Sequence, residues 1–573
     1  MTTKVFEIGS FFSLKINKIT KFINDLNIYN LSLLISVLIL IAHPAMTEHI
    51  EFALAANQQI HVSKFNYNFM VRMLDLSSQI SFFQFLLNLN LNPNFTQILV
   101  SFVATIIPVF ATLSIFKLID FKGKYSNTAL LALLCAVFYF LSNPINAAYY
   151  PWSPRIGFFE FGNQGMWLCI ASLILLILNR RLGFFLSGIL FSWHIVWFLP
   201  ILLYLLINLH KIEKKNYLYL ATGLMISFFF VKYGKSNLGS FISFSSSDWN
   251  QINFSHFEFH FKKITDSIWS QHNPKIFANK INYYYLLAVS IPILSLNYLN
   301  LPKQLIKFCN LLFLTTFFLI FYLEFARHYP LPFSDIIFRA IPNRFFNLIM
   351  AIYLYYLFFY CLNFNKNIKI NNYFLLFVFV APIFLYLKFY NILRLALFIL
   401  SYKYLKRNIK YLDLFLITIF LVLIAIKHYK STDYNIFSFL HPNKLEKFLS
   451  ENGRGQGYIL SQGIQSYKGL NVTAVAMSEY FSPTPPLFIN NKSIDLFCYE
   501  TSYFDNAKFQ YYWDVDKCFM SRSKKEWDYI SNQIGVNYVI VSNKVSLDLI
   551  LVLDYGGLRI YRIVDDNLLN TLS

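Results

Sequence analysis

Two arginines at the start of an apolar segment have side chains suited to holding a phosphate group. Arg339 and Arg344 are five positions apart, on either side of Pro342. A guanidinium group keeps its charge and presents parallel N–H donors that match phosphate oxygens. The pair therefore predicts a phosphate or oxyanion clamp. The alternative is the interfacial start of a helix, with both side chains reaching toward water.

Two carboxylates follow the first apolar run of the chain. Glu48 and Glu51 are three positions apart, so they share a face if the segment is helical. The chain has 29 Asp and Glu in 573 residues, and an ionisable side chain at the end of a membrane span is costly without a role or a partner. We interpret the pair as part of a site and rank Glu48 first, because it is nearer the apolar run. A solvated loop is the alternative.

The elements that must position these residues have the composition of membrane helices. Hydrophobic residues make up 56% of the chain and charged residues 14%, against roughly 25% charged residues in soluble domains. The net charge of +20 arises in residues 1–429, which carry 35 Lys/Arg and 14 Asp/Glu, whereas residues 430–573 carry 14 and 15. The basic residues form short clusters between apolar runs, as cytoplasmic loops do. This distribution argues against nucleic acid as a partner.

The apolar runs predict about 11–13 membrane helices, the first an uncleaved signal anchor with a cytoplasmic N-terminus. Two runs are too long for one span and are expected to be helix pairs: Leu182–Leu209, turning near His194, and Tyr373–Tyr402, meeting near Lys388. Single spans are expected at residues 25–42, 95–116, 127–142, 165–178, 217–231, 283–299, 304–323, 343–362 and 411–427.

This arrangement gathers the basic clusters on the cytoplasmic side and the other candidate residues on the outer side. The expected outer loops are residues 43–94, 143–164, 232–282 and 324–342. Loop 143–164 contains further substrate-binding candidates, Tyr150, Arg155 and Glu160, although an interfacial aromatic belt is the alternative for its Tyr and Trp residues. His194, at the expected helix break, is a fourth candidate.

Residues 430–573 have the pattern of a small soluble α/β domain, which the predicted topology places outside the cytoplasm. A helix is expected at Glu526–Ile534 with Ser523 as its cap. Strands are expected at Tyr458–Leu460, Tyr538–Val541, Leu549–Leu553 and Leu558–Ile563. Cys498 and Cys518 either form a disulfide or remain two buried thiols. The predicted fold class is thus mainly α, with a polytopic transmembrane domain over residues 1–429 and an α/β extracytoplasmic domain over 430–573.

The order of these features resembles the GT-C superfamily of polytopic membrane glycosyltransferases, in particular bacterial members. Glu48-His49-Ile50-Glu51-Phe52-Ala53 resembles the acidic pair and small residues of that family's first outer loop. Arg180-Arg181…Ser192-Trp193-His194…Pro200 is similar to a broken helix pair common in bacterial members, and Trp527…Val541…Ile563 looks like their C-terminal domains. One departure is that the family often has an Asp in the first outer loop, where both acids of this chain are Glu.

The resemblance implies a hexosyl- or pentosyltransferase of the bacterial cytoplasmic membrane that takes part in cell-envelope glycan or polysaccharide synthesis. Its donor would be a polyprenyl-phosphate-linked sugar and its acceptor a lipid or glycan on the outer face. Glu48 or Glu51 would act as general base on the acceptor hydroxyl, or would hold a divalent cation, Mg²⁺ or Mn²⁺. Arg339 and Arg344 would stabilise the departing phosphate. No other cofactor is expected.

Two other classes stay open. A polymerase or ligase of surface polysaccharide also has many spans, but it is expected to have one dominant outer loop and no appended α/β domain. A non-enzymatic transporter or flippase of lipid-linked sugars is expected to have repeated halves, and no internal repeat is evident by eye.

Overall fold

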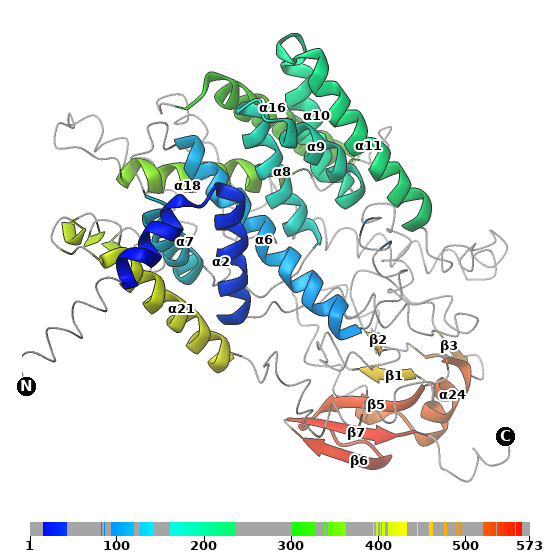
Figure 1. Cartoon of the computed structure of the whole chain (residues 1–573). Coiled ribbons are helices and arrows are strands. Elements are labelled where there is room, and N and C mark those ends of the chain that lie inside the picture. The colour runs from blue at the N-terminus through cyan, green and yellow to red at the C-terminus, as the bar shows by residue number, and fades with distance from the viewer. Residues whose placement is uncertain are drawn as a thin grey trace, which may run out of the picture. The chain divides into compact units, whose positions relative to one another are not determined.

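The computed structural model is mainly helical, with a mixed β-sheet near the C-terminus (Figure 1). It describes residues 15–42, 93–119, 126–141, 161–234, 301–326, 344–362, 411–431, 458–461, 475–477, 487–489, 492–494, 519–534, 536–555 and 557–563, together with isolated positions that include 401–402 and 404–406. The chain divides into two compact units. The first is Met1–Thr47, Ile98–Phe228 and His272–Asn435, and the second is Glu48–Gln97, Phe229–Gln271 and Ile436–Ser573. The expected division at residues 429 and 430 stays a prediction.

Helices cover most of the apolar runs singled out in the sequence. In chain order they are α2 (Ile28–Ala42), α6 (Pro93–Ile119), α7 (Asn127–Leu141), α8 (Phe161–Ile177), α9 (Arg181–Trp193), α10 (Ile195–Ile207), α11 (Lys214–Gly234), α16 (Lys303–Ala326), α18 (Arg344–Leu362) and α21 (Leu412–Ser431). The span expected at 283–299 and most of the pair expected at 373–402 lie outside the described residues.

One helix of the described residues is long and apolar enough by itself to cross a bilayer, over Lys303–Leu323. Only 33% of that stretch is buried, which is unlike the core helix of a soluble protein. Eight further helices contain shorter apolar stretches, of 10–17 described residues each. The helical fold class is therefore confirmed, and the number of membrane spans stays a prediction.

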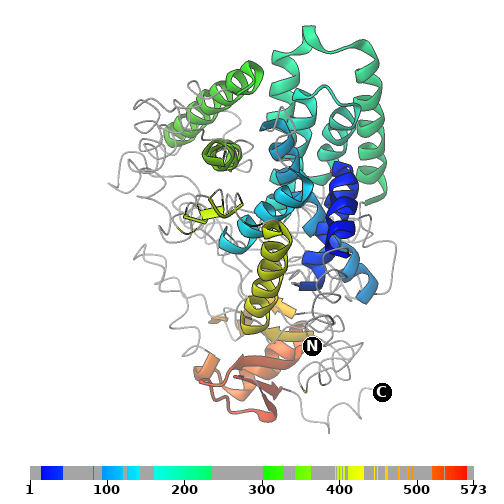
Figure 2. The ribbon, with the colours of Figure 1, turned by 60° about the vertical axis from the view of Figure 1, so that its left-hand side comes forward.

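The expected helix pair at Leu182–Leu209 is present, and its break lies at His194, between α9 and α10. The preceding hairpin is closed by Asn179, whose φ of 50° ends α8 in the left-handed conformation that Asn tolerates better than most residues. The N–H of Arg180 then donates to Leu175 O at 2.8 Å and that of Asn179 to Leu176 O at 2.9 Å. These bonds satisfy carbonyls at the end of α8 and turn the chain into α9. Helices α8 to α11 lie together as one group (Figures 1 and 2).

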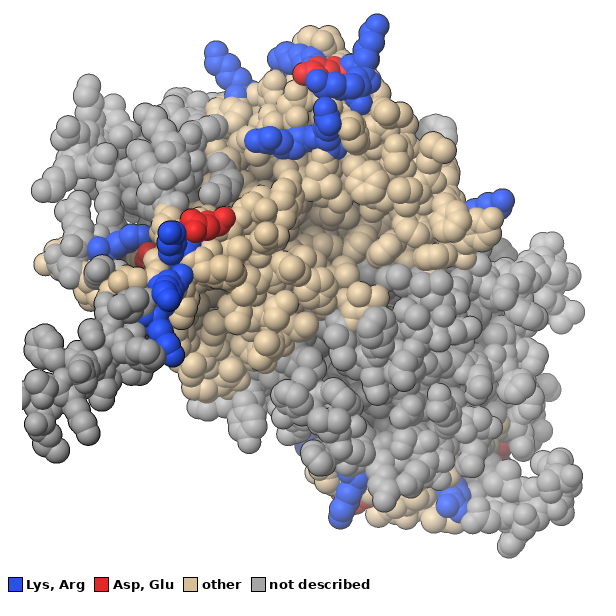
Figure 3. Space-filling model, in the orientation of Figure 1, with Lys and Arg blue, Asp and Glu red and all other residues tan. Residues whose placement is uncertain are grey.

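Polar contacts hold the α8–α9 turn against the connection from α10 to α11. Asn179 Nδ2 donates to Glu213 Oε1 at 3.5 Å, and Glu213 pairs with Lys215 at 2.6 Å. The Lys215 ammonium group lowers the pKa of the exposed Glu213 carboxyl below its ordinary value. The basic clusters at residues 180–181 and 211–215 consequently lie at the same end of this helix group, as expected from the sequence, and Figure 3 shows Lys and Arg gathered there.

Helices α9 and α11 approach until their backbones touch. A Cβ atom added to Gly188 would lie 2.5 Å from Leu224 N and 2.6 Å from Gly223 C, closer than atoms can pack. Ser227 Oγ crosses the same interface and donates to Gly188 O at 2.7 Å. Small residues that admit close backbone contact, with a hydroxyl bonded across it, are typical of helix packing in membranes.

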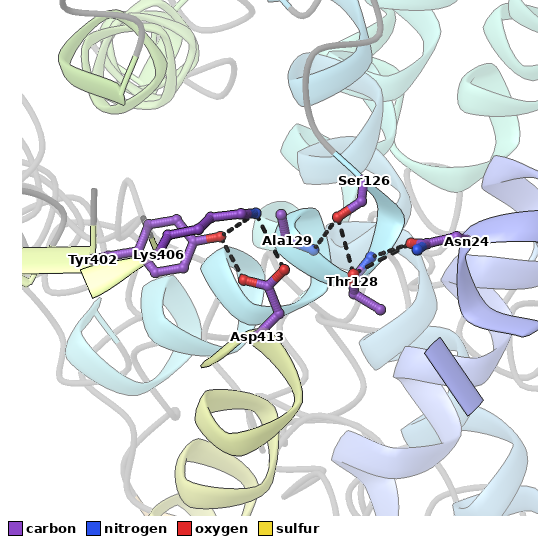
Figure 4. Close-up of polar contacts among 7 residues, drawn as sticks. All are labelled: Asn24, Ser126, Thr128, Ala129, Tyr402, Lys406 and Asp413. Carbon is purple, nitrogen blue, oxygen red and sulfur yellow. Dashed lines mark hydrogen bonds and ion pairs between the residues drawn. The ribbon is translucent and has the colours of Figure 1, made fainter. Parts of the chain in front are cut away.

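Side chains also fix the first turns of α7 and α21 (Figure 4). Asn24 Oδ1 accepts from the N–H of Thr128, the second residue of α7, at 3.1 Å. In return, Asn127 Nδ2 donates to Leu26 O at 2.7 Å, beyond the end of the helix at residues 15–25. Lys406 Nζ contacts Asp413 Oδ2, in the first turn of α21, at 3.1 Å. These contacts tie the N-terminal helix and the segment before α21 to their neighbours.

Helix α8 begins at Phe161, four residues before the expected start, so residues 161–164 belong to the helix and not to the expected outer loop 143–164. The missed turn contains Asn163 and Gln164, whose amides weaken the apolar pattern. Gln164 is buried nonetheless, because Nε2 donates to Ala104 O of α6 at 3.1 Å. That carbonyl lacks its usual helical donor, since the residue four positions later is Pro108, which has no N–H.

The C-terminal region confirms the expected α/β character. Strands β1 (Tyr458–Ser461), β2 (Val475–Met477), β5 (Val536–Ser542), β6 (Ile550–Tyr555) and β7 (Leu558–Arg562) form a sheet in the order β2-β1-β5-β7-β6. Strand β1 is parallel to β2 and β5, whereas β7 is antiparallel to β5 and β6. Strands β3 (Leu487–Ile489) and β4 (Lys492–Ile494) form a separate antiparallel pair.

Helix α24 (Lys524–Ile534) packs against β5 and begins with the predicted cap. Ser523 N donates to Glu526 Oε2 at 2.7 Å, and the N–H of Glu526 reaches back to Ser523 Oγ at 3.4 Å, the reciprocal pattern of a capping box. Before the helix, the buried Arg522 guanidinium lies 4.9 Å from the ring centroids of both Phe519 and Trp527. Cys498 and Cys518 lie outside the described residues, so their pairing stays a prediction.

Candidate functional site

Two of the eight candidate site residues, His194 and Arg344, fall within the part of the chain that the structure describes, and the structure brings these two together. They are 150 positions apart in the sequence, yet the residue after Arg344, Phe345, packs on Trp197, three positions after His194. The other six candidates lie outside the described residues, so their roles stay predictions; they are Glu48, Glu51, Tyr150, Arg155, Glu160 and Arg339.

His194 occupies the break between α9 and α10. Its backbone is extended, with φ of −165° and ψ of 100°, so it belongs to neither helix. Both of its backbone groups are nevertheless bonded, because its N–H donates to Leu190 O at 2.9 Å and its carbonyl accepts from Trp197 N at 3.0 Å. His194 therefore adds no unpaired backbone group of its own to the break, which favours burial of this residue in an apolar environment.

A glycine of α8 makes room for this break. A Cβ atom at Gly165 would lie 2.5 Å from Trp197 Cδ1 and 2.9 Å from His194 Cβ. Any larger residue at this position would push the first turn of α10 away from α8. The absence of a side chain therefore lets the imidazole and the indole pack directly on α8, and His194 keeps an exposed fraction of only 6%.

Arg344 enters the site as the first residue of α18. The next residue, Phe345, is buried and places its ring edge against Trp197, with centroids 5.9 Å apart and planes at 75°. This aromatic contact fixes the start of α18 beside the first turn of α10. The half-buried Arg344 side chain is thereby held next to the helix break.

The imidazole has unused hydrogen-bonding capacity. Among the described residues, Nδ1 of His194 is buried and has no hydrogen-bond partner. Buried polar atoms are nearly always paired, so such an atom requires an explanation. Next to a guanidinium, an imidazole N–H and the arginine donors together suit an anion, since each donates to the same kind of oxygen atom. The arrangement is chemically suited to binding a phosphate oxygen, the role expected of Arg344 from the sequence.

Sequence reasoning missed a second buried polar residue at this end of α8. Asn163 is 1% exposed, and both its Oδ1 and its Nδ2 have no partner among the described residues. It lies two positions before Gly165, so it is within about 3 Å of the level of the helix break along the axis. The signal is present in the sequence, as an amide pair immediately before an apolar run, but it lies within the expected outer loop 143–164.

The expected divalent-cation site stays a prediction, because the described residues do not include its proposed ligands. In the described ranges no group of three or more His, Cys, Asp or Glu side chains lies close enough to hold a metal ion. The two glutamates proposed for that role, Glu48 and Glu51, lie outside these ranges.

Comparison with known proteins gives no relative: no protein-family model, no curated protein and no solved structure matches this chain.

Proposed function

We propose that this chain is an integral membrane glycosyltransferase of GT-C type, which transfers a sugar from a polyprenyl-phosphate-linked donor to an acceptor on the outer face of a bacterial cytoplasmic membrane. The observation that carries the proposal is that the Trp197–Phe345 contact places Arg344 at the start of α18 beside the buried helix break at His194. Both residues were selected from the sequence for substrate binding, and nothing in their separation along the chain requires them to be neighbours.

Embedding in a membrane is supported by the helices around this pair. Helix α16 is long and apolar enough to cross a bilayer and is mostly unburied over that stretch. The basic clusters at residues 180–181 and 211–215 lie at one end of the helix group. Helix α9 leads from Arg181 at that end to the break at His194, a distance of about 20 Å along its axis. Under the positive-inside rule the basic end faces the cytoplasm, so the break faces the outer side.

The chemistry follows from charge. When a sugar leaves polyprenyl phosphate, negative charge grows on the departing phosphate, and a guanidinium in a water-poor site stabilises that charge more in the transition state than in the ground state. In the proposed reaction Arg344 supplies this charge and His194 donates a hydrogen bond to the same phosphate. Glu48 or Glu51 acts as general base on the acceptor hydroxyl or holds a divalent cation, and Arg339 assists Arg344.

The first test measures binding of polyprenyl phosphate against polyprenol to the purified full chain in lipid nanodiscs. We expect the phosphate to be preferred, and Arg344→Gln to weaken its binding about 10–100-fold, the value of a hydrogen bond to a charged group. His194→Gln weakens it less, because only a neutral donor is changed. Arg181→Gln is the matched control, since it removes an exposed arginine over the ring of Tyr219. Equal binding of phosphate and polyprenol would end the proposed role of the pair.

The second test follows labelled sugar from a lipid-linked donor in membrane vesicles that contain the chain. Sugar transfer predicts that the donor is consumed and that label appears in an acceptor. Movement of intact donor across the vesicle without consumption would instead identify a transporter. Full transfer activity in both Glu48→Gln and Glu51→Gln would exclude these carboxylates as general base or cation ligands, while leaving the phosphate site in place.

A further inference from the structure

A groove runs along the outward face of α16 and begins with two lysines. It is lined by Lys303, Ile306, Lys307, Asn310, Leu311 and Leu314. The two lysines are four positions apart, so they lie one above the other on the same face of the helix, and both are exposed. Two like charges at this spacing repel each other. An anion bound between them would remove that repulsion.

Beyond Asn310 the same face is apolar and exposed. Leu314 is 60% exposed and Phe318 is 67% exposed, at positions 11 and 15 residues beyond Lys303. The distance from Lys303 to Leu314 along the axis is about 16 Å, comparable to the length of a lipid acyl chain within one leaflet. The face therefore has two cations at one end and a hydrocarbon stripe of one leaflet's depth below them.

Contacts with α10 hold this face outward. Tyr204 OH donates to Gln304 Oε1 at 3.2 Å, and the Tyr204 ring lies edge-on to the buried Phe308, with centroids 5.8 Å apart. Gln304 and Phe308 follow Lys303 and Lys307 by one position each. The first turns of α16 are thus fixed on the α10 side, and the lysines remain on the other.

We propose that this groove binds an anionic glycerophospholipid of the cytoplasmic leaflet, with its phosphate between Lys303 and Lys307 and one acyl chain along Leu311 and Leu314. An acidic peptide would satisfy the lysines but not the apolar stripe, whereas a phospholipid satisfies both. Positive residues at the cytoplasmic end of a span attract anionic lipid headgroups. The proposal requires α16 to lie in a membrane and is independent of sugar transfer.

The test is native mass spectrometry of the purified full chain, incubated with equal amounts of phosphatidylglycerol and phosphatidylcholine of the same acyl length. We expect phosphatidylglycerol to be retained about 25-fold more, since each of the two lysines near an anionic headgroup contributes about a fivefold effect. The Lys303→Gln/Lys307→Gln variant is expected to lose that preference. Lys214→Gln/Lys215→Gln, which removes two exposed lysines of α11 that do not line the groove, is the control and keeps the preference.

A third variant separates a groove from a general charge effect. Leu314→Gln leaves both lysines and is expected to lower retention of both lipids severalfold, because an acyl chain loses its apolar contact. Equal retention of the two lipids by the unaltered chain would overturn the proposal, as would an equal loss of preference in the two double-lysine variants. Lys303→Gln/Lys307→Gln is also tested for sugar transfer in vesicles. Loss of the lipid preference with sugar transfer kept would show that the lipid site and the glycosyltransferase proposal are independent.

Discussion

The bond from Gln164 to α6 allows a quantitative test of how the first turn of α8 is held. Replacing Gln164 by Ala removes the donor to Ala104 O, a buried carbonyl whose usual helical donor is missing because Pro108 has no N–H. Leaving a buried carbonyl unpaired costs about 1–3 kcal/mol, whereas hydrogen bonds between membrane helices average about 0.6 kcal/mol. We expect a loss of about 1–2 kcal/mol in unfolding free energy.

A second substitution makes the reason testable. In a Pro108→Ala background the new N–H of residue 108 can donate to Ala104 O, as in any regular helix. Gln164→Ala should then cost less than it does in the original chain, by about 1 kcal/mol. The double-mutant cycle measures this difference directly, because it cancels the effect that each substitution has alone.

The neighbouring residue provides the control. Asn163 has the same functional group and the same burial, but neither of its amide atoms has a partner among the described residues. Asn163→Ala therefore removes no hydrogen bond and is expected to leave the thermal unfolding temperature in detergent unchanged or slightly raised. The reasoning is refuted if Asn163→Ala and Gln164→Ala lower that temperature equally, or if Pro108→Ala does not reduce the cost of Gln164→Ala.

Three further predictions concern packing and charge. Gly188→Ala should lower the unfolding free energy by about 1–3 kcal/mol, because the added Cβ lies 2.5 Å from Leu224 N and the α9–α11 contact must open by about 0.9 Å to reach ordinary contact. Thr222→Ala, on the exposed side of α11, should change it by less than about 0.5 kcal/mol. Equal effects of the two substitutions would contradict the close crossing. Arg522→Ala should destabilise the C-terminal region by about 1–2 kcal/mol through lost stacking on two rings, seen as earlier proteolysis of that region, and Arg522→Lys should restore part of the loss. The pKa of Glu213 is lowered by Lys215. Their pairing therefore stabilises the fold above the ordinary carboxyl pKa, and this stabilisation is lost as the pH falls through the lowered value. Melting curves of Glu213→Gln should differ from those of the unaltered chain only above that range, and only at low salt.

Local features of the sequence determined much of the helical structure. A helix pair was predicted at Leu182–Leu209 because a largely apolar run of 28 residues is too long for one span and basic clusters flank both ends. The cap at Ser523 was predictable from the local sequence, since its partner Glu526 lies within one turn. The short strands β2, β3 and β4 were missed, because three residues are too few to show a periodicity. Their strand conformation depends on pairing with a neighbouring strand.

The candidate site was only partly accessible in this way. The sequence identified His194 and Arg344 as separate candidates, but their meeting depends on contacts between α8, α10 and α18 that no local pattern encodes. Gly165 shows why: its role comes from the two side chains that occupy the space its own would fill. Likewise, Pro108 looks like a defect of α6 until Gln164 is found on the carbonyl it leaves unpaired. Residue type and spacing fix which backbone conformations are cheap, whereas the tertiary structure decides which distant side chains share a buried volume.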